Sequence, residues 1–134
     1  MTPDLSYLTW SALLCILMWL PHISVRALII GLPAAMGYPS EVPELPKWIA
    51  RAARSHTNMV ENLAPFAVLV LVAHVGGLAN ESTALGAALF FWAKLGHVIV
   101  HILGIPYIRT GAFLVSWVGM VLIAWQIVGP QLGG

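Results

Sequence analysis

The stretch that decides the fold runs from Arg109 to Val128 and reads RTGAFLVSWVGMVLIAWQIV. After its first residue it contains no charged side chain, and about 20 mostly apolar residues are what a helix needs to cross the hydrocarbon of a bilayer. Three further stretches meet the same criterion, namely Leu5 to Ala35, the residues after Pro46 to Val75, and Thr83 to Leu103. We therefore expect an all-α membrane protein, a bundle of four transmembrane helices.

The composition of the whole chain agrees with this class. The 134 residues are 60% hydrophobic and 8% charged, against about 45–50% and about 25% in soluble proteins. A soluble monomer and a disordered chain are both excluded. The net charge of +1 leaves no basic surface for nucleic acid. The single cysteine, Cys15, excludes an intrachain disulfide. The length fits one domain, residues 1–134.

The distribution of basic residues predicts the orientation in the membrane. Most of them lie at or near the first and third connections between spans: Arg26, Lys47, Arg51, Arg54 and Arg109. The N-terminus, the Gly76–Ser82 connection and the C-terminal tail contain no Lys or Arg. By the positive-inside rule, both termini lie outside and connections one and three lie in the cytoplasm. No basic residue precedes the first apolar run, so we expect a retained helix rather than a secretory signal.

One face of the second span carries a polar stripe. At about 100° per residue, its five members fall within one narrow arc: Arg51, Arg54, Asn58, Glu61 and Asn62. Ionisable residues at membrane depth are costly and usually functional. The alternative is a hydrogen-bond network between helices, with arginines that reach the membrane surface.

The third span has its own polar face, formed by Lys94, His97 and His101. Lys94 lies at the same depth as Glu61, so the two either form an ion pair or each contact a ligand. Arg109 opens the fourth span from the same side, unless it only anchors the membrane interface. Together these residues predict a cavity, open to the cytoplasmic half, that suits a small ligand carrying carboxylates and an amine.

Histidine spacing raises the question of a metal. His97 and His101 are four residues apart, which can place two imidazoles on one ion, but the neighbouring Lys94 opposes a cation. We therefore expect no metal. His22 and His56 are interpreted as structural residues.

At these residues a family resemblance becomes visible. Residues 51–66, RAARSHTNMVENLAPF, resemble the signature of the membrane-associated proteins in eicosanoid and glutathione metabolism (MAPEG), with arginines, Asn58, Glu61 and the Pro65–Phe66 pair. A second block, KLGHVIVH at 94–101 followed by GIPYIRT at 104–110, matches less closely. The resemblance covers essentially the whole chain and looks most like the small bacterial members, which implies a bacterial inner membrane.

The resemblance implies a homotrimer with glutathione, as co-substrate, bound between neighbouring subunits. It assigns glutathione contacts to residues matching Arg51, Arg54, Asn58 and Glu61, and stabilisation of the glutathione thiolate to Arg109. A guanidinium beside sulfur favours the charged thiolate, so this role is physically reasonable.

The chain departs from the family pattern at four positions, one of which is Thr57, where some eukaryotic relatives have a charged residue. Lys94 stands where many members have arginine, His101 where they usually have tyrosine, and Phe113 where some have an aromatic hydroxyl. We predict Arg109 and His101 as catalytic residues, because a histidine with a pKa of about 6.5 can accept a proton in place of the tyrosine. The predicted binding residues are Arg51, Arg54, Asn58, Glu61, Asn62, Lys94 and His97.

Three functions are compatible with these residues. The first is a glutathione-dependent transferase or peroxidase acting on lipophilic electrophiles that enter from the bilayer. The second is a non-catalytic MAPEG-like protein that binds a thiol or a lipid. The third is a small proton-coupled transporter in which Glu61 carries the proton.

Overall fold

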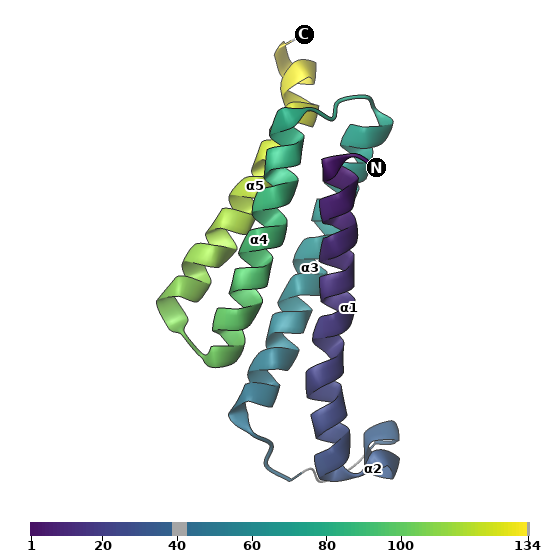
Figure 1. Cartoon of the computed structure of the whole chain (residues 1–134), viewed down its shortest axis with the longest axis vertical. Coiled ribbons are helices and arrows are strands. Elements are labelled where there is room, and N and C mark those ends of the chain that lie inside the picture. Colours follow the sequence, from purple (N-terminus) through teal and green to yellow (C-terminus); the bar gives the residue numbers. More distant parts are fainter. Residues whose placement is uncertain (39–42, 134) are drawn as a thin grey trace.

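The computed structural model describes residues 1–38 and 43–133 (Figure 1). In these residues the chain forms α1 (Pro3–Ile30), α2 (Leu32–Met36), α3 (Lys47–Val75), α4 (Glu81–Leu103) and α5 (Pro106–Gly133). The four long helices, α1, α3, α4 and α5, are each apolar and long enough to cross a membrane. The predicted all-α bundle of four transmembrane helices is confirmed.

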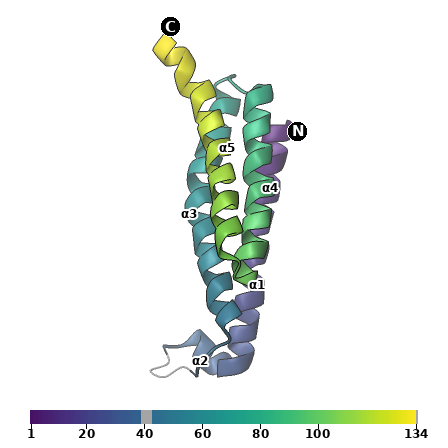
Figure 2. The ribbon, with the colours of Figure 1, turned by 90° about the vertical axis from the view of Figure 1, so that its left-hand side faces the viewer.

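The boundaries of two spans differ from the prediction. The first was expected to reach Ala35, but α1 ends at Ile30 because Gly31 has a φ of 88°, which breaks the helix and which glycine adopts readily. The chain then turns into the short α2, which projects from the end of the bundle (Figure 2). The fourth span begins at Pro106, three residues before Arg109. Residues 39–42 of the first connection lie outside the described residues.

Local sequence signals explain where the other helices begin and end. Asn80 caps α4, since its side chain accepts from the Thr83 N–H at 3.0 Å while the Thr83 hydroxyl accepts from the Asn80 N–H at 2.8 Å. This reciprocal capping box satisfies two donors of the first helical turn. Gly104 ends α4 in the left-handed conformation, with a φ of 78°, the usual helix-terminating role of glycine.

The core of the bundle is apolar and closely packed. The rings of Phe66 in α3 and Phe90 in α4 stack with centroids 3.8 Å apart, and both are fully buried. Between α4 and α5 the backbones touch at Gly86 and Gly119, where a Cβ on either residue would lie 2.6 Å from the carbonyl oxygen of the other. Only glycine allows this approach, which fixes the α4–α5 pair as one unit.

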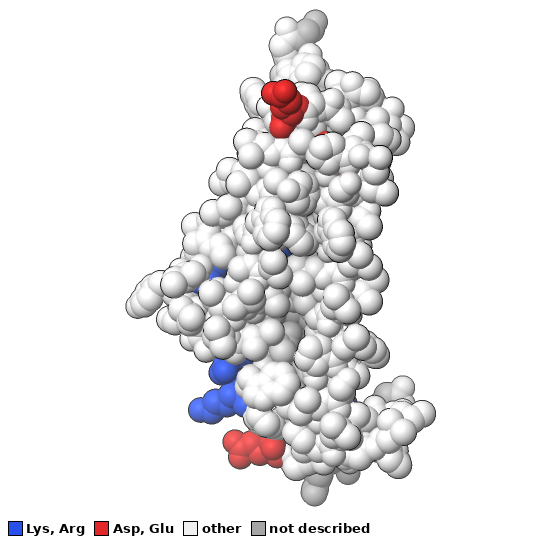
Figure 3. All heavy atoms as spheres, in the orientation of Figure 1, with Lys and Arg blue, Asp and Glu red and all other residues white. Residues whose placement is uncertain are grey.

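The outer surface is apolar, with the basic side chains collected toward one end. Large side chains such as Trp19, Trp92 and Trp125 are exposed, as expected for surfaces that face lipid or another subunit. In Figure 3 the Lys and Arg atoms lie from the middle of the bundle toward the end that carries α2. Both chain termini lie at the opposite end (Figure 1).

Candidate functional site

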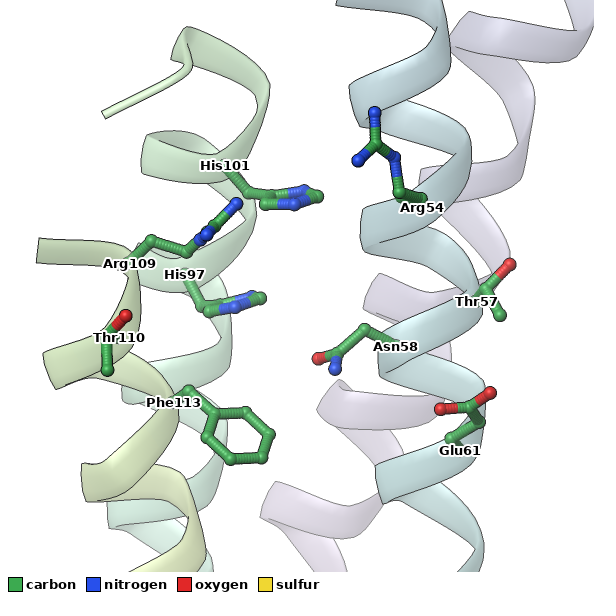
Figure 4. Close-up of a pocket in the computed structure, with 9 residues that line it drawn as sticks. All are labelled: Arg54, Thr57, Asn58, Glu61, His97, His101, Arg109, Thr110 and Phe113. Atoms are coloured by element: carbon green, nitrogen blue, oxygen red, sulfur yellow. The ribbon is translucent and has the colours of Figure 1, made fainter. Parts of the chain in front are cut away.

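A cavity of about 500 Å³ opens between α3 on one side and α4 and α5 on the other. Nine side chains line it, and Figure 4 shows all of them: Arg54, Thr57, Asn58, Glu61, His97, His101, Arg109, Thr110 and Phe113. The volume lies within the range of small-molecule sites, about 300–1,000 Å³. Three helices therefore contribute to one polar cavity.

The α3 wall follows from helical spacing. At about 100° per residue, Arg54, Thr57, Asn58 and Glu61 fall within one arc of the helix and so share one face. The Asn58 amide reaches across toward α4 and α5, whereas Thr57 and Glu61 stay close to α3 (Figure 4). Arg54, Thr57 and Glu61 are exposed in the single chain, while Asn58 is half-buried.

The opposite wall comes from the α4–α5 pair. The rings of His97 and His101 lie nearly parallel, 5.5 Å apart and one helical turn from each other. His101 is only 8% exposed, and its Nδ1 atom has no hydrogen-bond partner among the described residues. The left-handed Gly104 reverses the chain after α4, and this turn brings Arg109 of α5 to the same cavity (Figure 4).

Lys94 lies behind the cavity rather than on its wall. Its side chain is 1% exposed, and its Nζ atom donates to Asn58 Oδ1 at 2.9 Å. The same atom lies 4.9 Å from the centre of the Phe113 ring. The proposed Glu61–Lys94 ion pair is therefore wrong for the described structure, because Asn58 takes the place of the carboxylate and Glu61 is exposed.

Two further predicted binding residues also lie outside the cavity lining. Arg51 uses its Nε atom to donate to the carbonyl oxygen of Ile102 at 2.9 Å, and so holds the last turn of α4 against α3. A Cβ on Gly104 would lie 3.3 Å from the Arg51 guanidinium carbon, so the two residues pack closely. Asn62 donates from Nδ2 to the Asn58 backbone carbonyl at 2.7 Å.

Three of the lining residues received no role from sequence reasoning, namely Thr57, Thr110 and Phe113. Thr57 lies one turn from Arg54 on α3, and Thr110 directly follows Arg109 on α5. The positions of both threonines could have been found from helical spacing, but threonine is common in membrane helices and does not by itself indicate a site. The Thr57 hydroxyl donates to the Ala53 carbonyl at 3.2 Å within its own helix, as threonines in helices often do.

The charges across the cavity suit an anionic ligand with a cationic group. Arg54 and Arg109 come from opposite walls, and a guanidinium binds a carboxylate through two parallel hydrogen bonds. Glu61 at the rim is the single carboxylate of the lining and could pair with an amine. Within the described residues, no three His, Cys, Asp or Glu side chains are grouped as metal ligands.

Two of the remaining histidines lie together in another part of the bundle. His22 of α1 and His56 of α3 have ring centres 5.7 Å apart. A second cavity, of about 440 Å³, lies between these helices and is lined by apolar side chains with Cys15 and His56. It lies on the α3 face opposite the polar stripe, so it is separate from the candidate site.

Comparison with known proteins assigns the chain to a family. No curated protein matches the sequence. A family model described as MAPEG family matches residues 7–129, which covers nearly the whole chain and all the cavity residues. The match and the four apolar helices together indicate an integral membrane protein. The chain belongs to the MAPEG family.

Proposed function

We propose that this protein binds glutathione in the cavity between α3 and the α4–α5 pair, and uses it to conjugate or reduce lipophilic electrophiles. The observation that carries the proposal is the placement of Arg54 and Arg109 on opposite walls, with Glu61 at the rim. Glutathione has two carboxylates, one amine and one thiol, so its charges match this lining. The family includes glutathione transferases and peroxidases.

Ligand contacts follow from the charges of the lining. Arg54 pairs with one glutathione carboxylate, and Glu61 pairs with the amine. Asn58 offers hydrogen bonds to the peptide backbone of the ligand. Arg51 braces α3 against α4 through Ile102 rather than contacting the ligand, and Asn62 supports Asn58 from one turn away.

Arg109 and His101 carry the chemical step in this proposal. The thiol proton of glutathione moves to the imidazole of His101, which lines the cavity, and the Arg109 guanidinium stabilises the thiolate that remains. With an aryl halide as the electrophile, the thiolate sulfur bonds to the ring carbon and the halide leaves with the bonding electrons. The proton then resides on His101, the new bond is the thioether, and the halide carries the negative charge away.

The proposed assembly is a homotrimer in which neighbouring subunits close the cavity. Arg54, Thr57 and Glu61 are exposed in the single subunit, although they lie on a helix that is apolar and long enough to cross a membrane. Contact of Glu61 with lipid would cost several kcal/mol (roughly 2.5–3.5 for an acidic residue at the helix centre). A second copy of the chain that covers this face removes the cost.

Orientation follows from the collection of basic residues at one end (Figure 3). We propose that this end faces the cytoplasm, that both termini lie outside, and that the cavity opens toward the cytoplasmic half. The proposed location is a bacterial inner membrane. Lipophilic substrate then enters from the bilayer, while glutathione enters from the water phase.

A non-catalytic thiol- or lipid-binding role is the second candidate. It is favoured by Phe113, which gives the cavity an apolar wall where some MAPEG enzymes have a hydroxyl. A proton-coupled transporter is not supported in the same way, because Glu61 is the single carboxylate among the described residues that line the cavity.

A conjugation assay separates the two candidates. Purified protein in detergent is mixed with an activated aryl chloride, with and without glutathione, and thioether formation is followed by absorbance. The transferase predicts enzyme-dependent product that requires glutathione and is lost in Arg109→Ala. Binding of glutathione without any enzyme-dependent product would assign the non-catalytic role instead.

A further inference from the structure

We propose that Lys94 is a positioning residue that fixes the orientation of the Asn58 side-chain amide, so that the site presents a hydrogen-bond donor to its ligand at this position. This role rests on the glutathione site proposed above and adds which hydrogen-bonding groups of a ligand that site prefers. Lys94 itself does not touch the ligand, because it is 1% exposed and does not line the cavity.

The geometry of one hydrogen bond determines the orientation. An ammonium group can only donate, whereas an amide has a carbonyl end that accepts and an NH₂ end that donates. Lys94 Nζ lies 2.9 Å from Asn58 Oδ1, so the carbonyl end of the amide is held toward Lys94. Because Asn58 lines the cavity, its NH₂ end then remains to donate to a ligand.

The same ammonium group contacts a second element of the cavity wall. It lies 4.9 Å from the centre of the Phe113 ring on α5, within the range of a cation–π contact. Lys94 on α4 thus holds Asn58 of α3 and Phe113 of α5 at the same time. One buried side chain therefore links all three helices that form the site.

This arrangement has a consequence for ligand selection. With the NH₂ end fixed toward the cavity, Asn58 recognises a peptide carbonyl or a carboxylate and disfavours a group that only donates. Without Lys94 the amide can rotate, and part of its hydrogen-bonding preference is lost. Removing one partner from a hydrogen bond to a charged group costs enough to weaken ligand binding by about tenfold.

A double-mutant cycle tests the inference in the intact protein. The variants are Lys94→Met, Asn58→Ala and the double variant, and glutathione affinity is measured for each by titration calorimetry in detergent. Lys94→Arg keeps a donor at the same place and serves as the conservative rescue. Ile123→Val, a fully buried change in α5, controls for loss of stability without loss of the Lys94–Asn58 contact.

The positioning role predicts that Lys94→Met and Asn58→Ala each weaken glutathione binding by about tenfold. The double variant should then bind no more weakly than Asn58→Ala, because the two residues act through one contact. Lys94→Arg should restore most of the affinity, and Ile123→Val should leave it unchanged.

Different outcomes separate this inference from the proposed function. If the wild type does not bind glutathione, the proposed function fails. If the wild type binds but Lys94→Met binds equally well, or if the two single effects add in the double variant, the positioning role is refuted. If Lys94→Met does not fold, the Lys94→Arg and Asn58→Ala variants still decide the matter, since Lys94→Arg must then bind glutathione far better than Asn58→Ala.

Discussion

Substitution of Gly119 by alanine should separate α4 from α5 and destabilise the bundle. The new Cβ would lie 2.6 Å from the carbonyl oxygen of Gly86 and 3.1 Å from the backbone nitrogen of Phe90. Both neighbours are backbone atoms in well-formed helices, so they cannot move aside cheaply. Overpacking of this kind costs about 1–3 kcal/mol.

A matched control isolates that cost from helix propensity. Gly111 lies on the same helix, and a Cβ added there meets nothing within 4 Å. Replacing glycine by alanine within a helix stabilises the helix by up to about 1 kcal/mol at either position. The difference in unfolding free energy between the two variants therefore reports the steric overlap at Gly119.

Equilibrium unfolding in mixed detergent micelles measures this difference. Gly119→Ala should be less stable than Gly111→Ala by about 1–3 kcal/mol. A Gly119→Ala variant as stable as Gly111→Ala would refute the close approach of the two helices, and with it the fixed geometry of the α4–α5 wall.

Three further predictions concern the cavity and the membrane. Arg109→Ala should raise the thiol pKa of bound glutathione by about 1 to 3, and the near-ultraviolet absorbance of the thiolate at a given pH should fall. An unchanged thiolate fraction would remove Arg109 from the mechanism. Arg51→Gln should lower the free energy of unfolding by about 1.5–3 kcal/mol, because the Ile102 carbonyl loses a charge-assisted hydrogen bond. Glutathione affinity should change little. A loss of affinity without a loss of stability would make Arg51 a ligand contact. Glu44→Cys in a Cys15→Ala background should be labelled from the cytoplasmic side alone, and labelling from outside intact cells would overturn the orientation.

The fold could be predicted from sequence because hydropathy alone determines it. Four apolar runs separated by Pro and Gly turns leave little choice of architecture, and the structure has the four long helices close to the expected positions. The error at the end of α1 arose because Leu32–Met36 is apolar and helical, so the hydropathy continues past the break that the backbone makes at Gly31.

The site could be predicted in part. Helical periodicity placed Arg54, Asn58 and Glu61 on one face, and all three line the cavity, although their contacts with a ligand stay a prediction. The partners of Arg51 and Lys94 could not be predicted, because one is a backbone carbonyl on another helix and the other is an amide 36 residues away. Periodicity fixes the direction of a side chain on its own helix, but not which polar atom it meets across the bundle.

Direct titration of glutathione onto the purified protein tests the central claim most directly. Calorimetry in detergent should show saturable binding to the wild type. Arg54→Ala should bind more than tenfold more weakly, because the ligand and a neighbouring subunit would cover Arg54 in the complex, and truncation of one partner of such a charged pair costs about 2–5 kcal/mol. No binding to the wild type, or equal affinity of a folded Arg54→Ala variant, would contradict a glutathione site between α3 and the α4–α5 pair.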